Sequence, residues 1–296
     1  QEVTSWLHWY LDITHIKGLR LDAVKHIPAY FYQELLPKLR QDYQEELFTV
    51  GEYWHGDVYH LENYLKEVNF EMSLFDVPLH YHFYDASHSE NYDMSHIFDQ
   101  TLVSMYPSNA VTFVDNHDTE PSQSLASFIP DEFKGQAYCL ILLRKEGYPC
   151  VFYGDLEGIE YENISSKKAI LQKIMSLRKE YNNGYQDDYF DHPHLIGWTR
   201  HDEFKSMAVV LTNSTGGIKS MYVGKNFSNC YFVNVFNSSQ RVCINEEGYG
   251  DFYCEDKNFA VYVKSNHKYC SFLADMTSHT YFFDPTRGIQ QQFFMS

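Results

Sequence analysis

The chain has 296 residues, a length that suits one large domain or a domain and a half. Hydrophobic residues make up 44% of it, enough for a sizeable core. Its formal net charge of −17 argues against nucleic acid and anionic membranes as partners, because a polyanion would be repelled. The same charge is compatible with a neutral substrate and with bound Ca²⁺, and no apolar run reaches the roughly 18 residues of a membrane-spanning helix.

Aromatic residues are abundant at 17%, with 25 Tyr and 22 Phe. Aromatic surfaces suit ligands with apolar faces and polar edges, and sugars are one such class. An aromatic core is the alternative explanation, and composition alone does not separate the two.

The cysteines and the glycosylation sequons bear on the compartment. The six cysteines form no Cys-x-x-Cys pair, so a zinc site is not predicted. Their number, together with four Asn-x-Ser/Thr sequons, favours an oxidising, extracellular location, with the cytoplasm as the alternative. The sequons begin at Asn163, Asn213, Asn226 and Asn237.

Helical and strand-like patterns alternate from the start of the chain to about residue 185. Each predicted strand is short and apolar and is followed by polar residues, which is typical of repeated βα units with a parallel sheet. The count reaches five strands, whereas a closed (β/α)₈ barrel needs eight. We expect helices over 4–15, 28–44, 57–68, 94–105, 134–145 and 167–181, strands over 17–21, 47–50, 70–78, 110–114 and 148–153, and an irregular segment over 80–89.

After about residue 188 the pattern changes to short β-type runs separated by turn residues, which predicts an antiparallel sandwich. We therefore divide the chain into a barrel part (1–188), a β-sandwich domain (189–264), and a tail or an extension packed on the outside (265–296). Strands are expected over 194–200, 207–211, 219–223, 231–236, 242–245, 252–254 and 260–263.

The first predicted strand ends at a carboxylate. Arg20 and Asp22 are two residues apart, so both side chains lie on the same face of the strand. The guanidinium can then hold the carboxylate ionised and fixed in direction, as a nucleophile requires. A buried structural ion pair is the alternative interpretation of these two residues.

Carboxylates also follow two later strands. Asp22, Glu52 and Asp118 each come at or just after the end of a different predicted strand, and the active sites of parallel α/β barrels lie at that edge. Carboxylates placed by chance would be scattered over the chain. Three carboxylates at the ends of three strands therefore indicate a single site. Alone, Glu52 could be a solvated helix-cap glutamate and His117 a loop histidine with ordinary partners.

Two carboxylates that flank one bond are the requirement for glycoside hydrolysis. Arg20 is expected to lower the pKa of Asp22, which would then be the ionised nucleophile. Glu52 has no adjacent cation in the sequence and precedes Tyr53 and Trp54, so we expect desolvation to raise its pKa and make it the acid. Asp118 would hydrogen-bond sugar hydroxyls and favour the distorted ring.

Three segments, 18–26, 50–54 and 113–118, resemble the second, third and fourth sequence blocks of the α-amylase family, glycoside hydrolase family 13. They occur in the family's order and on the expected fourth, fifth and seventh strands. Segments 75–81, 151–155, 189–192 and 196–200 are similar to the bacterial liquefying type. The resemblance covers about nine tenths of the chain, and it implies the C-terminal part of a (β/α)₈ barrel, strands four to eight, followed by a β-sandwich.

By position, the resemblance implies Asp22 as nucleophile, Glu52 as acid/base and Asp118 as transition-state stabiliser. Substrate contacts are expected from Arg20, Lys25, His26, Trp54 and His117. The implied reaction is retaining endo-hydrolysis of α-1,4-glucosidic bonds in starch, glycogen and maltooligosaccharides through a covalent glycosyl-enzyme. The implied cofactor is Ca²⁺, with the backbone carbonyl of His26 as one ligand and a second site near Asp187, Asp188 and Asn213.

The family's first block and its strands one to three are missing, and the chain opens on Gln1 instead of methionine. We therefore expect this chain to be the C-terminal portion of an amylase, with an N-terminal half as a further partner. The alternatives are a truncated or inactive carbohydrate-binding relative and a transglycosylase of the same family.

Overall fold

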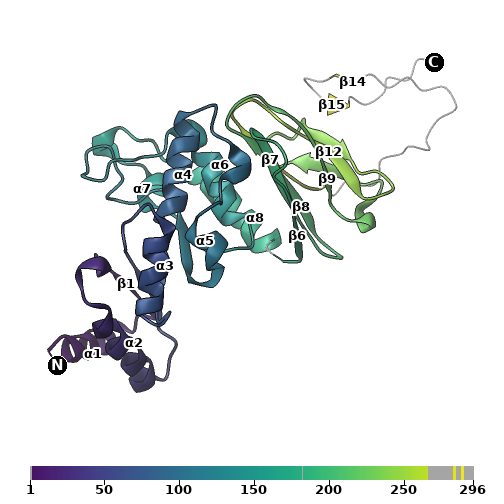
Figure 1. The fold of residues 1–296 in the computed structure, drawn as a ribbon. Helices are drawn as coiled ribbons and strands as arrows, with labels where there is room; N and C mark the ends of the chain where they lie inside the picture. The colour runs from purple at the N-terminus through teal and green to yellow at the C-terminus, as the bar shows by residue number, and fades with distance from the viewer. Residues whose placement is uncertain (1, 182, 266–282, 285–287, 290–296) are drawn as a thin grey trace, which may run out of the picture. The chain divides into compact units, whose positions relative to one another are not determined.

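The computed structural model describes residues 2–181, 183–265, 283–284 and 288–289 (Figure 1). Contacts divide the chain into two compact units, each of which is described by itself. Unit 1 comprises 1–84, 97–128 and 146–166, and unit 2 comprises 85–96, 129–145 and 167–296. Because these units do not follow the linear order of the chain, the domain boundary at 188/189 stays a prediction. The predicted tail falls almost wholly outside the described residues.

Unit 1 is built on a parallel sheet of five strands in sequential order. Gly18 pairs with Phe48 and Leu21 with Gly51, so the first two strands end at the same level. Sequential order with a helical crossover between strands is the arrangement of a TIM barrel, and five strands make up part of one. The strands are β1 (Gly18–Leu21), β2 (Phe48–Gly51), β3 (Ser73–Phe75), β4 (Ala110–Phe113) and β5 (Tyr148–Cys150).

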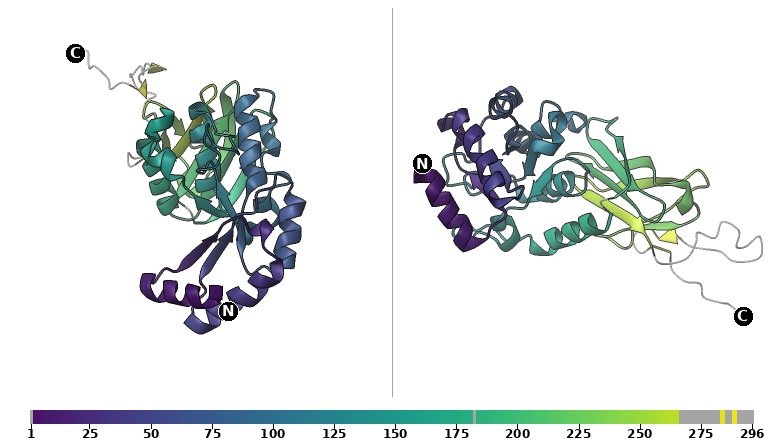
Figure 2. Two further views of the ribbon diagram at one scale, coloured as in Figure 1. Left: turned by 90° about the vertical axis from the view of Figure 1, so that its left-hand side faces the viewer. Right: turned by 90° about the horizontal axis from the view of Figure 1, so that it is seen from below.

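The helices alternate with these strands as the sequence predicts, and the fan of strands with helices beside it is visible in Figure 2. Short 3₁₀ turns lie at Val24–His26, Met94–His96, Pro107–Asn109, Glu160–Glu162 and Lys225–Phe227. The helices are α1 (Glu2–Thr14), α2 (Ala29–Tyr43), α3 (Val58–Glu67), α4 (Val77–His88), α5 (Leu102–Met105), α6 (Asp131–Leu142), α7 (Tyr153–Glu157) and α8 (Lys168–Tyr181).

Several segments differ from the prediction. The helix Tyr153–Glu157 and the strand Tyr185–Tyr189 were not expected, and two other segments have a different structure from the one predicted. Residues 80–89 are not irregular, because α4 covers most of them and Asp76 receives the backbone N–H of Leu79 at the start of that helix. Residues 94–105 are not one helix, since Gln100 has a left-handed backbone with φ of 52°. Only the last part forms a helix, which Thr101 caps by accepting the Ser104 N–H.

Unit 2 contains the antiparallel sandwich. One sheet has the order β11-β10-β13-β8-β7-β6, and β12 pairs with β9 in a second sheet. A core that includes Phe232 from the first sheet and Met221 and Phe252 from the second joins the two layers. The strands are β6 (Tyr185–Tyr189), β7 (Leu195–His201), β8 (Ser206–Thr212), β9 (Gly217–Tyr222), β10 (Tyr231–Asn234), β11 (Arg241–Cys243), β12 (Tyr249–Cys254) and β13 (Phe259–Lys264). The last four described residues form β14 (Phe283–Asp284) and β15 (Gly288–Ile289).

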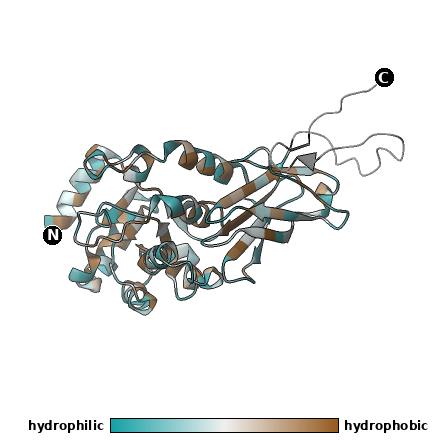
Figure 3. Ribbon diagram, turned by 90° about the horizontal axis from the view of Figure 1, so that it is seen from above, coloured by the Kyte–Doolittle hydropathy of each residue, from teal (hydrophilic) through white to brown (hydrophobic). Residues whose placement is uncertain are grey.

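Hydrophobic residues follow the strands, and the helices alternate between hydrophobic and hydrophilic residues (Figure 3). Helix α1 carries apolar residues on two sides. Leu7 and Leu11 are buried, while Trp6 and Ile13 are 53% and 60% exposed. Among the residues described, no helix has the length and hydropathy needed to cross a membrane.

Candidate active site

The ends of β1 and β2 bring the first two predicted carboxylates together. Asp22 and Glu52 follow the paired residues Leu21 and Gly51, and neighbouring strands lie about 4.8 Å apart. The Glu52 N–H donates to the carbonyl of Leu21 (2.8 Å), which extends the ladder to this point. The two carboxylates therefore stand side by side at the carboxyl edge of the sheet.

Arg20 contacts both of them. Its Nη1 donates to Oδ1 of Asp22 (2.5 Å), and its Nη2 lies 3.7 Å from Oε2 of Glu52. The expectation that Glu52 lacks a neighbouring cation is therefore wrong, because the cation comes from the adjacent strand. The two carboxylates differ in exposure, however, since the side chain of Asp22 is 71% exposed and that of Glu52 only 11%.

A strained turn supplies another donor to Glu52. Ala23 has a left-handed backbone with φ of 48°, which is uncommon for a residue other than glycine. Its N–H donates to Oε2 of Glu52 (2.9 Å), and the Val24 N–H donates to the Glu52 carbonyl (3.0 Å). The turn after β1 thus fixes the glutamate that follows β2.

An aromatic wall continues from Glu52 toward β4. Trp54 is buried and donates its indole N–H to the hydroxyl of Tyr81 (3.0 Å). The rings of Trp54 and Phe113 lie 6.0 Å apart in one cluster, so the loop after β2 packs on the end of β4. Lys25 Nζ donates to the carbonyl of Trp54 (3.2 Å), which joins the segment after β1 to the same wall. Of the other predicted binding residues, His26 ends the 3₁₀ turn that follows Ala23.

Asp118 lies in a tightly hydrogen-bonded loop after β4. The side-chain oxygen of Asn116 accepts the N–H groups of Asp118 (2.9 Å) and Thr119 (3.0 Å). His117 Nε2 lies 3.3 Å from Oδ2 of Asp118. Because β4 runs parallel to β1 and β2, the loop that carries Asp118 leaves the sheet at the same carboxyl edge as the segments that carry Asp22 and Glu52.

Asp76, which follows β3, has a structural role that was not predicted from the sequence. It is fully buried and accepts backbone N–H groups of Leu79 (3.2 Å), Leu102 (3.0 Å) and Val103 (2.7 Å). Burial raises its pKa to about 6, against the effect of these N–H donors. An aspartate directly before Val-Pro-Leu was the available signal, since aspartate is a preferred helix cap. Asp76 holds the starts of α4 and α5 and so supports the wall formed by Tyr81.

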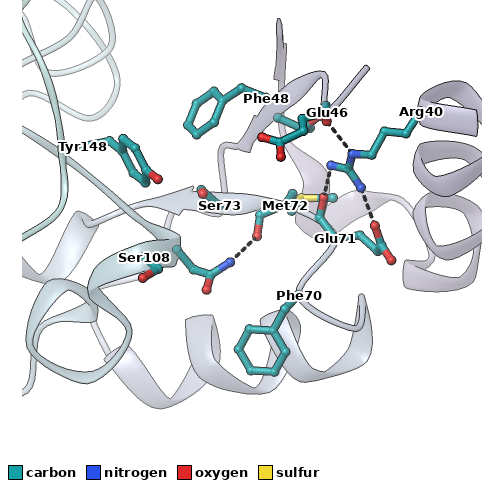
Figure 4. A pocket seen from close by; sticks show the side chains of 11 residues that line it. Arg40, Glu46, Phe48, Phe70, Glu71, Met72, Ser73, Ser108 and Tyr148 are labelled. Atoms are coloured by element: carbon teal, nitrogen blue, oxygen red, sulfur yellow. Dashed lines mark hydrogen bonds and ion pairs between the residues drawn. The ribbon is translucent and has the colours of Figure 1, made fainter. Parts of the chain in front are cut away.

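A cavity of about 310 Å³ lies at the opposite edge of this sheet (Figure 4). Phe48, Ser73 and Tyr148, the first residues of three strands, line it. Arg40 closes one side, donating to the carbonyls of Glu46 (2.7 Å) and Glu71 (2.6 Å). None of the predicted catalytic residues lines this cavity, so the carboxylate edge is the candidate active site.

The residues predicted near a second calcium ion do not fit a common site. Asp188 forms a bidentate ion pair with Arg144 (2.6 and 2.9 Å), and Asp187 bonds to His201 (2.8 Å). Asn213 lies one residue past β8, whereas Asp188 is in register with the middle of that strand through Trp198. Asn213 therefore lies four residues along the strand from the position that is in register with Asp188, a separation of about 13 Å. Within the described residues, no three His, Cys, Asp or Glu side chains form a group suited to a metal ion.

A partial parallel barrel with carboxylates at the ends of its strands defines the class of α/β-barrel enzymes. The family model described as "Alpha amylase, catalytic domain" matches residues 1–214. The chain belongs to the α-amylase family.

The chain is similar to whole α-amylases over most of its own length. It is 46% identical over 268 residues to an α-amylase of Geobacillus stearothermophilus, covering 88% of this chain and 49% of that protein. It is 43% identical to an α-amylase of Bacillus licheniformis (89% and 53% covered) and 38% identical to a cytoplasmic α-amylase of Escherichia coli (89% and 56% covered). The chain thus spans about half the length of the curated relatives it matches.

Solved structures share the fold. An Anoxybacillus α-amylase superimposes with a TM-score of 0.68 at 20% identity, covering 90% of this chain and 64% of that one. An α-amylase from Geobacillus thermoleovorans, complexed with acarbose, gives 0.66 at 19% identity, with 90% and 65% covered.

Proposed function

We propose that this chain carries the catalytic carboxylates of a retaining endo-hydrolase of α-1,4-glucosidic bonds. The observation that carries the proposal is the guanidinium of Arg20, which contacts Asp22 and Glu52 where adjacent strands end. Retaining glycosidases need two carboxyl groups close together on opposite sides of the scissile bond. Family membership supports α-glucans such as starch, glycogen and maltooligosaccharides as the substrate class.

In the proposed first step, the carboxylate of Asp22 attacks the anomeric carbon while Glu52 gives its proton to the leaving glucosidic oxygen. The glycosidic bond breaks, and a glycosyl ester forms on Asp22. In the second step, Glu52 takes a proton from water, whose oxygen displaces Asp22 and restores the enzyme. The exposure of Asp22 suits an attacking group, and the hydrogen bond from Ala23 suits a fixed acid/base.

Asp118 and its neighbours have binding roles in this proposal. Asp118 would bind hydroxyls of the sugar whose ring distorts, and His117 would bind beside it. Lys25, His26 and Trp54 would line the leaving-group side. Tyr81 joins them as the residue that positions Trp54.

The test measures the release of reducing ends from starch, first by the chain alone and then by the chain mixed with an amino-terminal α-amylase fragment from a relative. We expect turnover in the mixture, and we expect Glu52→Gln and Asp22→Asn each to abolish it while the thermal unfolding midpoint hardly moves. Activity that survives either substitution would show that the assigned roles are wrong. Starch binding without turnover would favour the non-catalytic relative, and transfer products would favour the transglycosylase.

Calcium remains a proposed cofactor of the longer protein through the carbonyl of His26, and no step of the reaction depends on it here. The compartment is also a proposal. Cys243 forms a disulfide, which supports an oxidising location, whereas Cys139, Cys150, Cys230 and Cys254 are free thiols and one relative is named as cytoplasmic.

A further inference from the structure

A buried amide side chain helps to connect the segment between α4 and the Met94–His96 turn to the sandwich. Asn213 follows β8 and is 6% exposed. Its Nδ2 donates to the carbonyl of Ser89 (3.2 Å) and to the carbonyl of Tyr92 (3.1 Å). These residues all belong to unit 2, and they are more than 120 positions apart in the chain.

The orientation of this amide follows from its partners. Two carbonyl oxygens face the same atom, and a carbonyl can only accept, so that atom is the NH₂ group. The opposite orientation would place Oδ1 against both carbonyls. Backbone carbonyls that converge on one point are also how proteins hold Ca²⁺. Here two N–H donors occupy that point.

The neighbouring charges agree with this arrangement. The ammonium of Lys257 pairs with Glu90, which lies between Ser89 and Tyr92. The backbone N–H of Lys257 donates to the carbonyl of Ser214 (2.8 Å), one residue after Asn213. The carboxylate of the 89–92 loop therefore already has a cationic partner, and both side chains are exposed.

The side chain opposite Asn213 is neutral or cationic. Leu195 pairs with Thr212, so the register of β7 and β8 places His194 across from Asn213. Oδ1 of Asn213 and Nδ1 of His194 are both buried and make no hydrogen bond. The strand pair thus puts an imidazole opposite Asn213. The nearby carboxylate of Asp93, which follows Tyr92, interacts with His194 and accepts from the N–H and hydroxyl of Ser95.

We propose that the amide of Asn213 takes the place of a calcium ion between the 89–92 loop and β8. The connection is therefore independent of calcium in this chain. This inference does not rest on the proposed reaction. It concerns the second calcium position that the sequence reasoning expected near Asn213.

The test compares thermal unfolding midpoints in EDTA and in millimolar CaCl₂ for the full chain, Asn213→Ala and Asn213→Asp. We expect calcium to shift the thermal unfolding midpoint by the same amount in the unsubstituted chain and in Asn213→Ala, although the alanine variant unfolds at a lower temperature. A shift that is present in the full chain and absent from Asn213→Ala would overturn the proposal, because it would locate a bound cation at Asn213.

Asn213→Asp has the same shape but puts a carboxylate oxygen where the NH₂ group lies. Two carbonyls and a carboxylate then converge without a donor, so we expect a lower midpoint in EDTA and a recovery of several degrees in CaCl₂ that MgCl₂ does not match. If CaCl₂ does not raise the midpoint of Asn213→Asp more than MgCl₂ does, the two carbonyls are not arranged to bind a calcium ion. If this variant does not fold in either buffer, the alanine comparison still decides.

Discussion

Arg20 is the side chain through which the two proposed catalytic carboxylates are coupled. Its planar guanidinium reaches Asp22 with one nitrogen and approaches Glu52 with the other, which a lysine ammonium cannot reproduce. Arg20→Lys should therefore lower kcat by about 10²-fold when the chain is assayed with an amino-terminal α-amylase fragment. The reason is that small misplacements of reacting groups lower the rate strongly. KM should change little.

The matched control for that measurement is Arg241→Lys, since Arg241 is an exposed arginine of β11. Steady-state kinetics and thermal unfolding of both variants separate positioning from folding. An equal loss of kcat in the control, or an Arg20→Lys variant with full activity, would remove Arg20 from the mechanism.

Asp76 gives a prediction about pH. Burial raises its pKa to about 6 from 3.8, so the folded state binds the proton more tightly than the unfolded state. The stability that protonation contributes is present below pH 3.8 and is lost as the pH rises through about 6. The free energy of unfolding of the wild type minus that of Asp76→Asn should therefore increase as the pH is lowered from 7 to 4.

Denaturant titrations at several pH values measure this difference. Asp202→Asn is the control, because backbone N–H groups of Lys205 and Phe204 lower the pKa of Asp202, which is half-buried. Its contribution is lost only as the pH falls below 3.8, so the corresponding difference should stay flat over the same range. A flat profile for Asp76→Asn as well would contradict the raised pKa.

The positions of the three catalytic candidates could be read from the sequence because each follows a short apolar strand, and strand ends are marked by a change in polarity. The contact of Arg20 with Glu52 could not be predicted in this way, because it depends on the register of two strands. The hydrogen bond from Ala23 could not be predicted either, because it depends on a left-handed backbone. Neither the strand register nor the backbone conformation can be inferred from the local amino-acid composition.

Helix α1 allows a comparison of two faces of one element. Leu11 is 4% exposed and packs with Leu35 and Leu39 of α2, whereas Ile13 is 60% exposed. Leu11→Ala should lower the free energy of unfolding by about 2–5 kcal/mol, because it leaves a cavity. Ile13→Lys should change it by less than about 0.5 kcal/mol. Equal effects in chemical denaturation would mean that α1 does not pack as described.

At the scale of elements, strands and amphipathic helices were predictable and aromatic segments were not. The bounds of β1, β2, β4 and most sandwich strands fall close to the predicted ranges, since apolar runs with turn residues are clear signals. Helix α4 was not predicted because its histidine and tyrosine residues obscure the helical periodicity of its hydrophobic residues. The 94–105 prediction failed because helical spacing of apolar residues does not reveal a left-handed residue such as Gln100.

The whole molecule leaves apolar surface uncovered in unit 1. The outer face of α1 and the rim of the Figure 4 cavity include Trp6, Ile13, Phe48 and Tyr148, all more than 40% exposed. Within the part of the chain that the structure describes, the five-stranded parallel sheet also has unpaired edges at β1 and β5. These surfaces suit the proposed amino-terminal partner.

Charge placed on that surface should weaken assembly without unfolding the chain. We expect Trp6→Glu combined with Ile13→Lys to raise the concentration of amino-terminal fragment needed for half-maximal starch hydrolysis by at least about tenfold. Tyr59→Glu, an exposed aromatic of α3 outside this surface, is the control. Unchanged complementation in the double variant would place the partner elsewhere.

The buried amide of Asn213 sets an order of events for a secreted version of this protein. Asn213 begins a sequon, and the nitrogen that would carry the glycan already donates to Ser89 and Tyr92. Folding and glycan transfer therefore compete for one atom. A chain glycosylated at this position could not close the loop onto β8, whereas a chain that folds first hides the acceptor. The fraction modified at Asn213, set against the exposed sequon at Asn163, would report how fast this part of the sandwich forms.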